Sequence, residues 1–496
     1  MDTVFQPERL FDDIGRSYGS AYGANPGLDS LLARVSQHVS SDASVLDVGC
    51  GTGHPVSAYF AEKGCAVTGV DISQVMVDLC RSKIKGTFIK ADMTTFEPEG
   101  KFDVVLAIFS MLQMPYSSVW SMVYRLASFL RPDGLLCLGT LTAEFVRSAV
   151  DHHVKDSSED YIEEVYVQFM GKTEPITALS EAAWLRIVKQ AGLSIISTEH
   201  DAVQPDHPTA LEEKTFFIVA QRRDLHPLMG PYPLPVRPPA PHRLDQAGWQ
   251  PLAERFIRSE LPAVLEAVKD NKEVLDVGSG HGELPIAIAK RVGKAYAIEP
   301  NSDRNDLLLD RGKGSNVHIA TGTAEALPYP DKTFDAVVAM WILHYVDDLE
   351  KSLSEMTRVV DRAAPEARIV IVQGAPYNEA VNMINTVCGP IVATDPDEPV
   401  MDHQGFFLSK ACDVFRANGF GNITLEPVNV TCAFPEEELS VRCSRAAEVL
   451  AGFWYCSHPK IEDMKKAFIS VLERHFKYKP FEIGDQAVML VARPSL

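Results

Sequence analysis

Short apolar runs and amphipathic stretches alternate along the first half of the chain. Runs of about four to eight apolar residues fit buried strands. We interpret five runs in this way, at residues 45–48, 67–71, 86–92, 102–109 and 135–139. Residues 73–82 follow a helical period instead. Strands that alternate with helices are typical of a mostly parallel, doubly wound α/β sheet.

The second half of the chain repeats this order. Its predicted strands cover residues 274–277, 295–299, 316–320, 334–340 and 367–373. In both halves a helix then ends at a glycine, Gly192 or Gly419, which is a C-cap signal. Two further strands complete each sheet, at residues 193–199 and 214–220 and at residues 423–430 and 487–492. The short, turn-rich link between the first pair permits an antiparallel hairpin.

The two halves differ in what joins their last two strands. In the second half a mainly helical insertion of about residues 435–479 lies there, which would reshape a substrate pocket or form an interdomain contact. Between the halves, seven prolines fall within residues 227–241. Such a stretch favours an extended spacer, although it could also pack along a domain. We predict domains at 1–222 and 245–496, with a Pro-rich linker at 223–244.

One loop signature occurs in both halves. After the first strand of each half, glycines stand at alternate positions, Gly49, Gly51 and Gly53 and then Gly278, Gly280 and Gly282. The next strand ends in an acid, Asp71 or Glu299. A strand, a glycine-rich turn, a helix and a strand ending in a carboxylate form half of a nucleotide-binding site. The chain therefore holds two such units in tandem.

The glycine spacing argues against a dinucleotide. The dinucleotide fingerprint needs a small residue where the helix packs on the strand, but His54 and Glu283 stand there. A glutamate would repel a pyrophosphate, and neither loop carries Lys or Arg. The spacing fits a ligand whose only anion is one carboxylate, bound by the amides of the turn.

Both loops resemble the glycine motif of class I S-adenosylmethionine-dependent methyltransferases. The segments Ala91-Asp92-Met93 and Gly322-Thr323-Ala324 resemble the family's loop after the third strand. The pairs Phe102-Asp103 and Phe334-Asp335 resemble its motif before the fourth strand. The resemblance extends over about residues 40–140 and 270–375, and it implies two tandem Rossmann-like sheets joined by the Pro-rich linker.

The resemblance also implies the cofactor, S-adenosylmethionine, and the residues that bind it in each half. Asp71 and Glu299 match the acid that holds both ribose hydroxyls, and Asp92 matches the Asp that meets the adenine amino group. Thr323 replaces that Asp in the second half, which implies weaker binding there. The expected cofactor-binding residues are Asp47, Gly49, Gly51, Gly53, Asp71, Asp92, Met93, Asp276, Gly278, Gly280, Gly282, Glu299, Thr323 and Ala324.

The segment after the fourth strand differs between the halves. Alignment on Phe-Asp places Leu112 opposite His344. In relatives this segment lines the methyl-transfer chamber, so His344 is a candidate general base or substrate ligand. The alternative is a structural histidine that holds the start of the next helix. The first half has no base at this position.

The missing base favours a carboxylate as the methyl acceptor, because a carboxylate is nucleophilic without losing a proton. Such an acceptor needs a cation to anchor it. The candidate anchors are Arg16, Lys172, Arg186, Arg243, His403 and Arg442. Overall the chain is similar to fungal dual-domain small-molecule methyltransferases, including those that esterify small di- and tricarboxylic acids. This implies O-methylation of such an acid, in up to two successive transfers. The alternatives are a tandem N- or phenol O-methyltransferase of secondary metabolism, or a protein in which one repeat only binds the cofactor.

Several residues beside these motifs have structural interpretations. Asp103 and Asp335 are expected to be caps, and Cys50 a small filler. His54 and His281 are expected to form structural hydrogen bonds beside the glycine turns. The aromatic residues of the N-terminal arm are either core residues or part of the lid that precedes the first strand in this family, namely Phe11, Tyr18 and Tyr22.

Composition sets the class of protein. The chain has 496 residues, 46% of them apolar, and a net charge of −20, which argues against a nucleic-acid surface. No apolar run approaches the roughly 18 residues of a membrane span. The nine cysteines form no C-x-x-C pair and are expected to be reduced. The first residues lack a basic stretch followed by an apolar one. We expect a cytoplasmic enzyme with a small-molecule substrate and no metal site.

Overall fold

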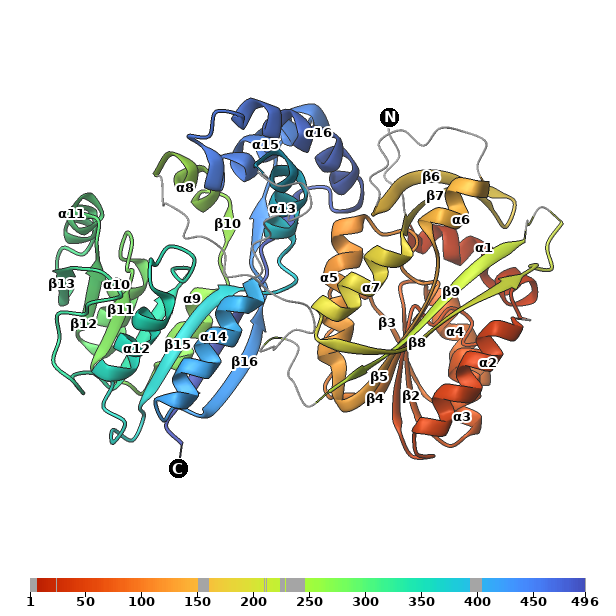
Figure 1. Cartoon of the computed structure of the whole chain (residues 1–496), viewed down its shortest axis with the longest axis horizontal. Helices are drawn as coiled ribbons and strands as arrows, with labels where there is room; N and C mark the ends of the chain where they lie inside the picture. Colours follow the sequence, from red (N-terminus) through yellow and green to blue (C-terminus); the bar gives the residue numbers. More distant parts are fainter. Residues whose placement is uncertain are drawn as a thin grey trace. The chain divides into compact units, whose positions relative to one another are not determined.

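The computed structural model describes residues 7–23, 25–149, 160–208, 210, 212–223, 228, 246–392 and 404–495. The chain forms two compact units, Met1–Pro235 and Val236–Leu496. Each unit holds one seven-stranded sheet (Figure 1). The division falls within the predicted Pro-rich linker, of which only residues 223 and 228 belong to the described part. The exact domain boundaries stay a prediction.

The sheet of the first unit has the strand order β3-β2-β1-β4-β5-β9-β8. The first five strands are parallel, and β9 is antiparallel to both β5 and β8. The predicted doubly wound sheet and its antiparallel last pair are thus confirmed. The strands are β1 (Ser44–Val48), β2 (Ala66–Asp71), β3 (Thr87–Lys90), β4 (Phe102–Ile108), β5 (Leu130–Leu141), β8 (Leu193–Val203) and β9 (Glu213–Arg222).

The second unit repeats this topology strand for strand, in the order β13-β12-β11-β14-β15-β19-β16. Again β19 is antiparallel to its two neighbours, and the other five strands are parallel. The prediction of two tandem sheets is therefore confirmed. The strands are β11 (Val274–Val277), β12 (Ala295–Glu299), β13 (Val317–Thr321), β14 (Ala336–Met340), β15 (Arg368–Gly374), β16 (Asn422–Val428) and β19 (Ala487–Arg493).

Side-chain caps begin several helices of the first unit. Asn25, Ser73 and Ser180 each accept a hydrogen bond from the backbone amide three residues later, which satisfies a free donor of the first turn. The helices are α1 (Pro7–Ala21), α2 (Pro26–Val35), α3 (Val56–Glu62), α4 (Gln74–Lys83), α5 (Tyr116–Phe129), α6 (Ala143–Ala149) and α7 (Glu181–Gln190), with a 3₁₀ turn η1 (Ser36–His38). The apolar faces of β1 and β4 form a core with Phe60 and Leu32, which are fully buried.

A two-stranded hairpin in the first unit was not predicted. It consists of β6 (Tyr161–Phe169) and β7 (Lys172–Leu179), which pair antiparallel. The outer part of β6 alternates polar and partly buried residues, so it lacks the continuous apolar run by which the other strands were recognised. Phe169 and Met170 at its turn pack against α1.

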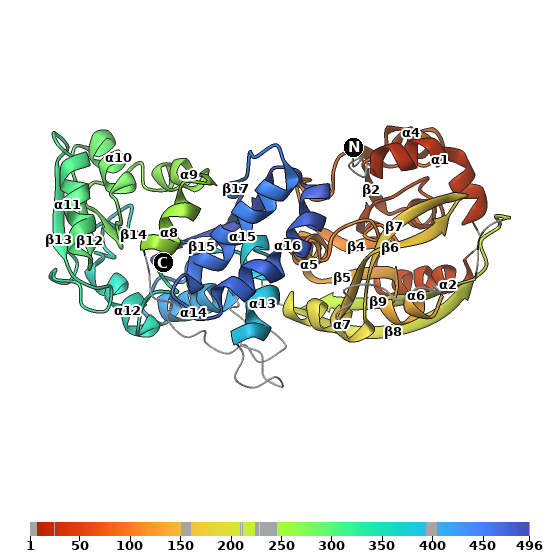
Figure 2. The ribbon, with the colours of Figure 1, turned by 90° about the horizontal axis from the view of Figure 1, so that it is seen from above.

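The predicted helical insertion of the second unit covers a helical region. It contains α15 (Leu439–Tyr455) and α16 (Ile461–Tyr478), which pack on each other, on α13 (Glu379–Val392) and, through α15, on α8 (Gln246–Ala253). We call α13, α15 and α16 the helical cap; Figure 2 shows them grouped together. The other helices are α9 (Glu260–Ala267), α10 (Glu283–Val292), α11 (Ser302–Arg311), α12 (Leu349–Val359) and α14 (Gln404–Ala417). A small sheet that was not predicted joins β10 (Phe256–Ile257), β17 (Thr431–Ala433) and β18 (Glu482–Gly484).

Candidate functional site

The two glycine loops lie at the carboxyl ends of β1 and β11 and have the same backbone conformation. All six glycines have positive φ angles, among them 52° at both Gly51 and Gly280. Side chains would also clash at the other four glycines of the loops. For example, a Cβ at Gly49 would lie 2.3 Å from Cβ of Ser110, and one at Gly282 would lie 1.9 Å from Cδ1 of Leu308. Glycine is therefore required at these four positions by both backbone angle and space, and at Gly51 and Gly280 by backbone angle.

Each loop is tied to the acid that ends the next strand. The amide of Gly51 donates to Oδ2 of Asp71 over 2.8 Å, and the amide of Gly280 donates to Oε2 of Glu299 over 3.0 Å. The second oxygen of Asp71 accepts from the Ser73 amide at 2.9 Å. Both carboxylates are buried, so these hydrogen bonds fix the orientation of the two side chains. The two predicted ribose acids thus occupy equivalent places.

The residues expected around the adenine lie beside these acids. The amide of Ala91 donates to the carbonyl of Asp71 over 3.0 Å, which brings Asp92 and Met93 to the same edge of the sheet. In the second unit the amide of Gly322 donates to the carbonyl of Glu299 over 3.4 Å, which does the same for Thr323 and Ala324.

A second acid lies behind each loop. Ser57 donates to Oδ2 of Asp47 over 2.6 Å, and the carboxyl group is almost fully buried. Burial raises the pKa of Asp47 to about 7. Burial, followed by the neighbouring charge of Glu299, raises the pKa of Asp276 to about 8. A cationic ligand would favour the ionised form of both acids, so the sites suit a positively charged cofactor.

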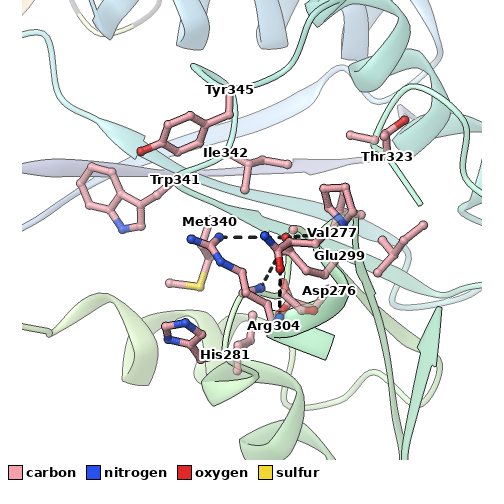
Figure 3. A pocket seen from close by; sticks show the side chains of 18 of the residues that line it. Asp276, Val277, His281, Glu299, Arg304, Thr323, Met340, Trp341, Ile342 and Tyr345 are labelled. Carbon is pink, nitrogen blue, oxygen red and sulfur yellow. Dashed lines mark hydrogen bonds and ion pairs between the residues drawn. The ribbon is translucent and has the colours of Figure 1, made fainter. Parts of the chain in front are cut away.

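In the second unit these residues line a pocket of about 860 Å³ (Figure 3). Its polar part includes His281, whose pKa is lowered by burial and by the positive charges of Arg304 and Arg311. Trp341, Ile342 and Tyr345 gather on one side of the pocket, apart from Glu299 and Asp276. The expected cofactor residues that line it are Asp276, Gly278, Gly280, Glu299, Thr323 and Ala324, while Gly282 follows in the same loop.

His344 does not belong to the described lining of this pocket. Its Nδ1 accepts a hydrogen bond from Nε2 of Gln373 over 3.0 Å, and Gln373 also donates to Gln404 over 2.7 Å. The ring is 5% exposed and lies among aromatic neighbours, including Phe407 and Trp454. This position favours the structural alternative. The role of general base stays a prediction without support from the geometry.

Two arginines that the sequence analysis missed line the pocket. Arg258 donates through Nε to Glu260 over 2.6 Å and through Nη1 to Glu283 over 2.8 Å. No described residue accepts a hydrogen bond from its Nη2. Arg304, in the first turn of α11, lies 4.0 Å from Oε1 of Glu299. Arg304 follows the predicted ribose acid Glu299 by five residues, which was a signal in the sequence. No such signal marked Arg258.

The cations proposed from sequence have other partners where the structure describes them. Lys172 pairs with Asp13, and Arg186 pairs with Asp160. Arg442 donates to the carbonyls of Glu436 and Glu437 and lies over the ring of Phe481. Arg243, His403 and the side chain of Arg16 lie outside the described residues.

The N-terminal arm covers the glycine loop of the first unit. A Cβ at Gly51 would lie 3.6 Å from Cε1 of Tyr18, and Tyr18 stacks on Tyr22 with ring centroids 5.1 Å apart. The hydroxyl of Tyr22 donates to Glu213, at the start of β9, over 2.7 Å. Lys172 in the β6–β7 hairpin pairs with Asp13 of α1 over 2.9 Å. The arm therefore lies where a lid would.

The two acids before the fourth strands are caps. Asp103 accepts hydrogen bonds from the amide and the hydroxyl of Ser44, both over 2.7 Å. Asp335 accepts from the amides of Lys272 and Glu273 at 2.8 and 3.0 Å. They hold neighbouring strands together and take no part in the pocket of the second unit.

No three His, Cys, Asp or Glu side chains of the described residues are grouped so as to hold a metal ion. None of the described helices is long and apolar enough to span a bilayer.

Comparison with known proteins finds relatives of part of each unit. Residues 45–134 match a family model described as a methyltransferase domain, and residues 275–364 match a second model with the same description. The chain is 34% identical over 124 residues to the ubiquinone/menaquinone biosynthesis C-methyltransferase UbiE of Hahella chejuensis, which covers 23% of this chain and 48% of that protein. It is 30% identical over 129 residues to the uncharacterized methyltransferase YcgJ of Bacillus subtilis, covering 24% and 48%. The chain thus spans about half the length of these relatives.

Solved structures resemble single units of the chain. YcgJ of B. subtilis aligns with a TM-score of 0.33 at 20% identity over 48% of this chain and 98% of its own. The magnesium protoporphyrin IX methyltransferase of Synechocystis aligns with a TM-score of 0.32 at 19% identity over 44% and 100%.

Proposed function

We propose that this chain, which carries two class I methyltransferase domains in tandem, transfers methyl groups from S-adenosylmethionine to a small carboxylic acid and forms methyl esters. Two observations on the pocket of the second unit support this class of acceptor. Arg258 lines the pocket, whereas His344 does not. A cation in a pocket that His344 does not line suits an acceptor that is already an anion.

The described residues fit the cofactor. S-adenosylmethionine, when bound, supplies an electrophilic methyl group on a positively charged sulfur. Asp71 and Glu299 are held by loop amides in a direction that suits two ribose hydroxyls. The left-handed glycines carry no side chains, so a ligand can approach the backbone of each loop closely. Asp47 and Asp276, whose pKa values are raised by burial, suit the ammonium group of the same ligand.

The chemistry needs positioning more than proton transfer. An acceptor carboxylate forms the new oxygen–carbon bond with a lone pair, so no proton has to leave. The enzyme's contribution is to hold the reacting atoms about 3–3.5 Å apart and in line. Arg258 is already oriented by Glu260 and Glu283, so its Nη2 is presented in a defined direction. A fixed guanidinium gives the acceptor both charge balance and orientation.

Two domains allow two successive transfers. A diacid loses one charge when it is esterified once, so its monoester is a different ligand. The domains differ where acceptors would bind: the first has α1 and the β6–β7 hairpin, and the second has α8 and the helical cap. This difference supports a division of labour between a diacid and its monoester.

A second candidate is C- or O-methylation of a flat phenol or quinol. Two observations favour it: the aromatic residues Trp249, Trp341 and Tyr345 line the pocket of the second domain, and a relative is named a C-methyltransferase of ubiquinone and menaquinone biosynthesis.

The test is to incubate the full chain and S-adenosylmethionine with matched acids, phenols and amines, followed by mass spectrometry. We expect acids to gain one or two methyl groups that mild base removes, as esters require. Methylation of phenols or amines in preference to every acid would refute the carboxylate acceptor. Separate knockouts, Gly51→Arg and Gly280→Arg, should show which domain forms the monoester.

A further inference from the structure

We propose that the second domain selects acceptors with a flat, apolar body, which rests on an aromatic wall formed by Trp249 and Trp341 and supported by Phe256. This inference rests on the proposed methyltransferase function. The wall would contact the uncharged part of the acceptor, whereas Arg258 would bind its carboxylate.

The two tryptophans of the wall are linked through Phe256. The rings of Trp341 and Phe256 lie nearly parallel, with centroids 6.4 Å apart and 18° between their planes. Phe256 also contacts Trp249, with centroids 5.8 Å apart. Both indole rings line the pocket, together with Tyr345. Aromatic faces of this kind favour stacking with another flat ring or conjugated system.

The backbone supports the position of Trp341 independently. Trp341 has a φ angle of 59°, in the left-handed region that bulky residues rarely adopt. Its amide donates to the carbonyl of Val372 over 2.8 Å, which holds this conformation. The first domain has Phe109 at the equivalent position, with φ of 53° and a 2.8 Å bond to Gly139. Strained residues of this type cluster at functional sites, and here both repeats keep an aromatic ring in the strained position.

The helical cap fixes the other half of the wall. A Cβ at Gly248 would lie 2.3 Å from the carbonyl oxygen of Gly452, so α8 and α15 approach through their backbones. Trp249 contacts Phe453 with centroids 6.2 Å apart, and Phe453 stacks on Trp454. The insertion therefore supports one side of the pocket of its own domain, which the sequence left open.

Two carboxylates of the pocket, Glu299 and Asp276, lie apart from Trp341. Figure 3 shows Trp341, Ile342 and Tyr345 on one side and Glu299 and Asp276 further along the pocket. Leu261 and Val346 add apolar lining. Arg258 lines the same pocket. A ligand that fits both the aromatic wall and Arg258 is an aryl or conjugated carboxylic acid, or the flat monoester of a diacid.

The test uses the full chain with Asp71→Ala, so that transfer is confined to the second domain. The probes are 2-naphthoic acid, its methyl ester, 2-naphthol and succinic acid, each with S-adenosylmethionine or S-adenosylhomocysteine. Trp341→Leu removes the ring, Trp341→Phe keeps an aromatic one, and Phe481→Leu is the matched control, because Phe481 is 52% exposed and does not belong to the pocket.

We expect Trp341→Leu to weaken binding of naphthoic acid and of its ester about tenfold, by calorimetry with S-adenosylhomocysteine present. Trp341→Phe should restore most of this loss. S-adenosylhomocysteine itself should bind all variants alike, which shows that they are folded, and Phe481→Leu should change nothing.

The outcomes separate the two proposals. If the flat probes bind no better than succinic acid, or bind Trp341→Leu unchanged, the aromatic wall is refuted even where acids are esterified. If the flat probes bind through Trp341 but only naphthol is methylated, the wall stands and the carboxylate acceptor fails.

Discussion

The amide of Gly51 donates a hydrogen bond to the carboxylate of Asp71 over 2.8 Å, so the turn after β1 is joined directly to the end of β2. The pair Gly280 and Glu299 repeats this bond at 3.0 Å. In each domain the acid expected to hold the ribose is therefore oriented before a ligand arrives. Such preorganisation lowers the ordering cost of binding.

The first prediction concerns stoichiometry. The chain should bind two S-adenosylhomocysteine molecules, and Asp71→Ala should reduce the tight sites to one, because the lost ribose contacts are worth about 1.5–3 kcal/mol, or roughly ten- to a hundredfold in affinity. Titration calorimetry of the full chain measures this. Asp78→Ala, at a side chain 62% exposed, is the control. A stoichiometry of two in Asp71→Ala with unchanged affinities would refute the assignment.

The second prediction concerns pH. Because burial raises the pKa of Asp276 to about 8, the folded protein without ligand holds this proton between about pH 4 and 8, where the unfolded chain has released it. The contribution of Asp276 to stability therefore falls as pH rises through this range. Asp276→Asn should remove that part of the slope when thermal unfolding is followed against pH.

The ionisation of Asp276 should also make cofactor binding depend on pH. The ionised carboxylate suits a cationic ligand, so the affinity of the second domain for S-adenosylmethionine should rise with pH towards 8 and level off above it. An identical pH slope of unfolding in the wild type and in Asp276→Asn would contradict both expectations.

The third prediction concerns the N-terminal arm. Tyr22→Phe removes the 2.7 Å bond from Tyr22 to Glu213 and loosens the arm over the first glycine loop. Cofactor affinity in the first domain should fall about three- to tenfold, since a typical hydrogen bond contributes about 0.5–1.5 kcal/mol. Calorimetry with Glu299→Ala in the background isolates this site. Tyr166→Phe, at a residue 59% exposed, should bind as before.

The fourth prediction tests the proposed anchor. Arg258→Lys keeps the positive charge beside the buried Glu260 but loses the planar fork, so KM for the acid should rise about tenfold while kcat changes little. Arg445→Lys, at an exposed pair with Glu448, is the matched control. An unchanged KM in Arg258→Lys would place the acceptor carboxylate elsewhere.

The fifth prediction concerns His344. Because its Nδ1 accepts from Gln373 outside the pocket lining, His344→Asn should lower the melting temperature while kcat and its pH profile stay nearly unchanged. A general base would instead contribute about 10²–10⁴-fold to the rate. If His344→Asn instead abolished the fall in kcat at acidic pH, the prediction would be wrong and His344 would be the general base.

The sequence by itself determined the features that depend on neighbours along the chain. Apolar runs around Val45 and Val274 predicted the central strands, because burial on both faces of a parallel sheet demands such runs. The alternate glycines predicted the left-handed turns, since glycine adopts positive φ without strain. The acids Asp71 and Glu299 followed from their place at the end of the second strand.

Only the tertiary structure decided which side chains meet across the fold. Alignment of the two halves put His344 at the pocket, but its Nδ1 is bonded to Gln373 and it does not belong to the described lining. Arg258 was missed because it precedes the glycine loop and reaches the pocket only when β10 pairs with β17. The aromatic wall likewise joins Trp249 and Trp341 from distant elements. Which side chains meet depends on packing between elements far apart in sequence, and local patterns do not specify these contacts.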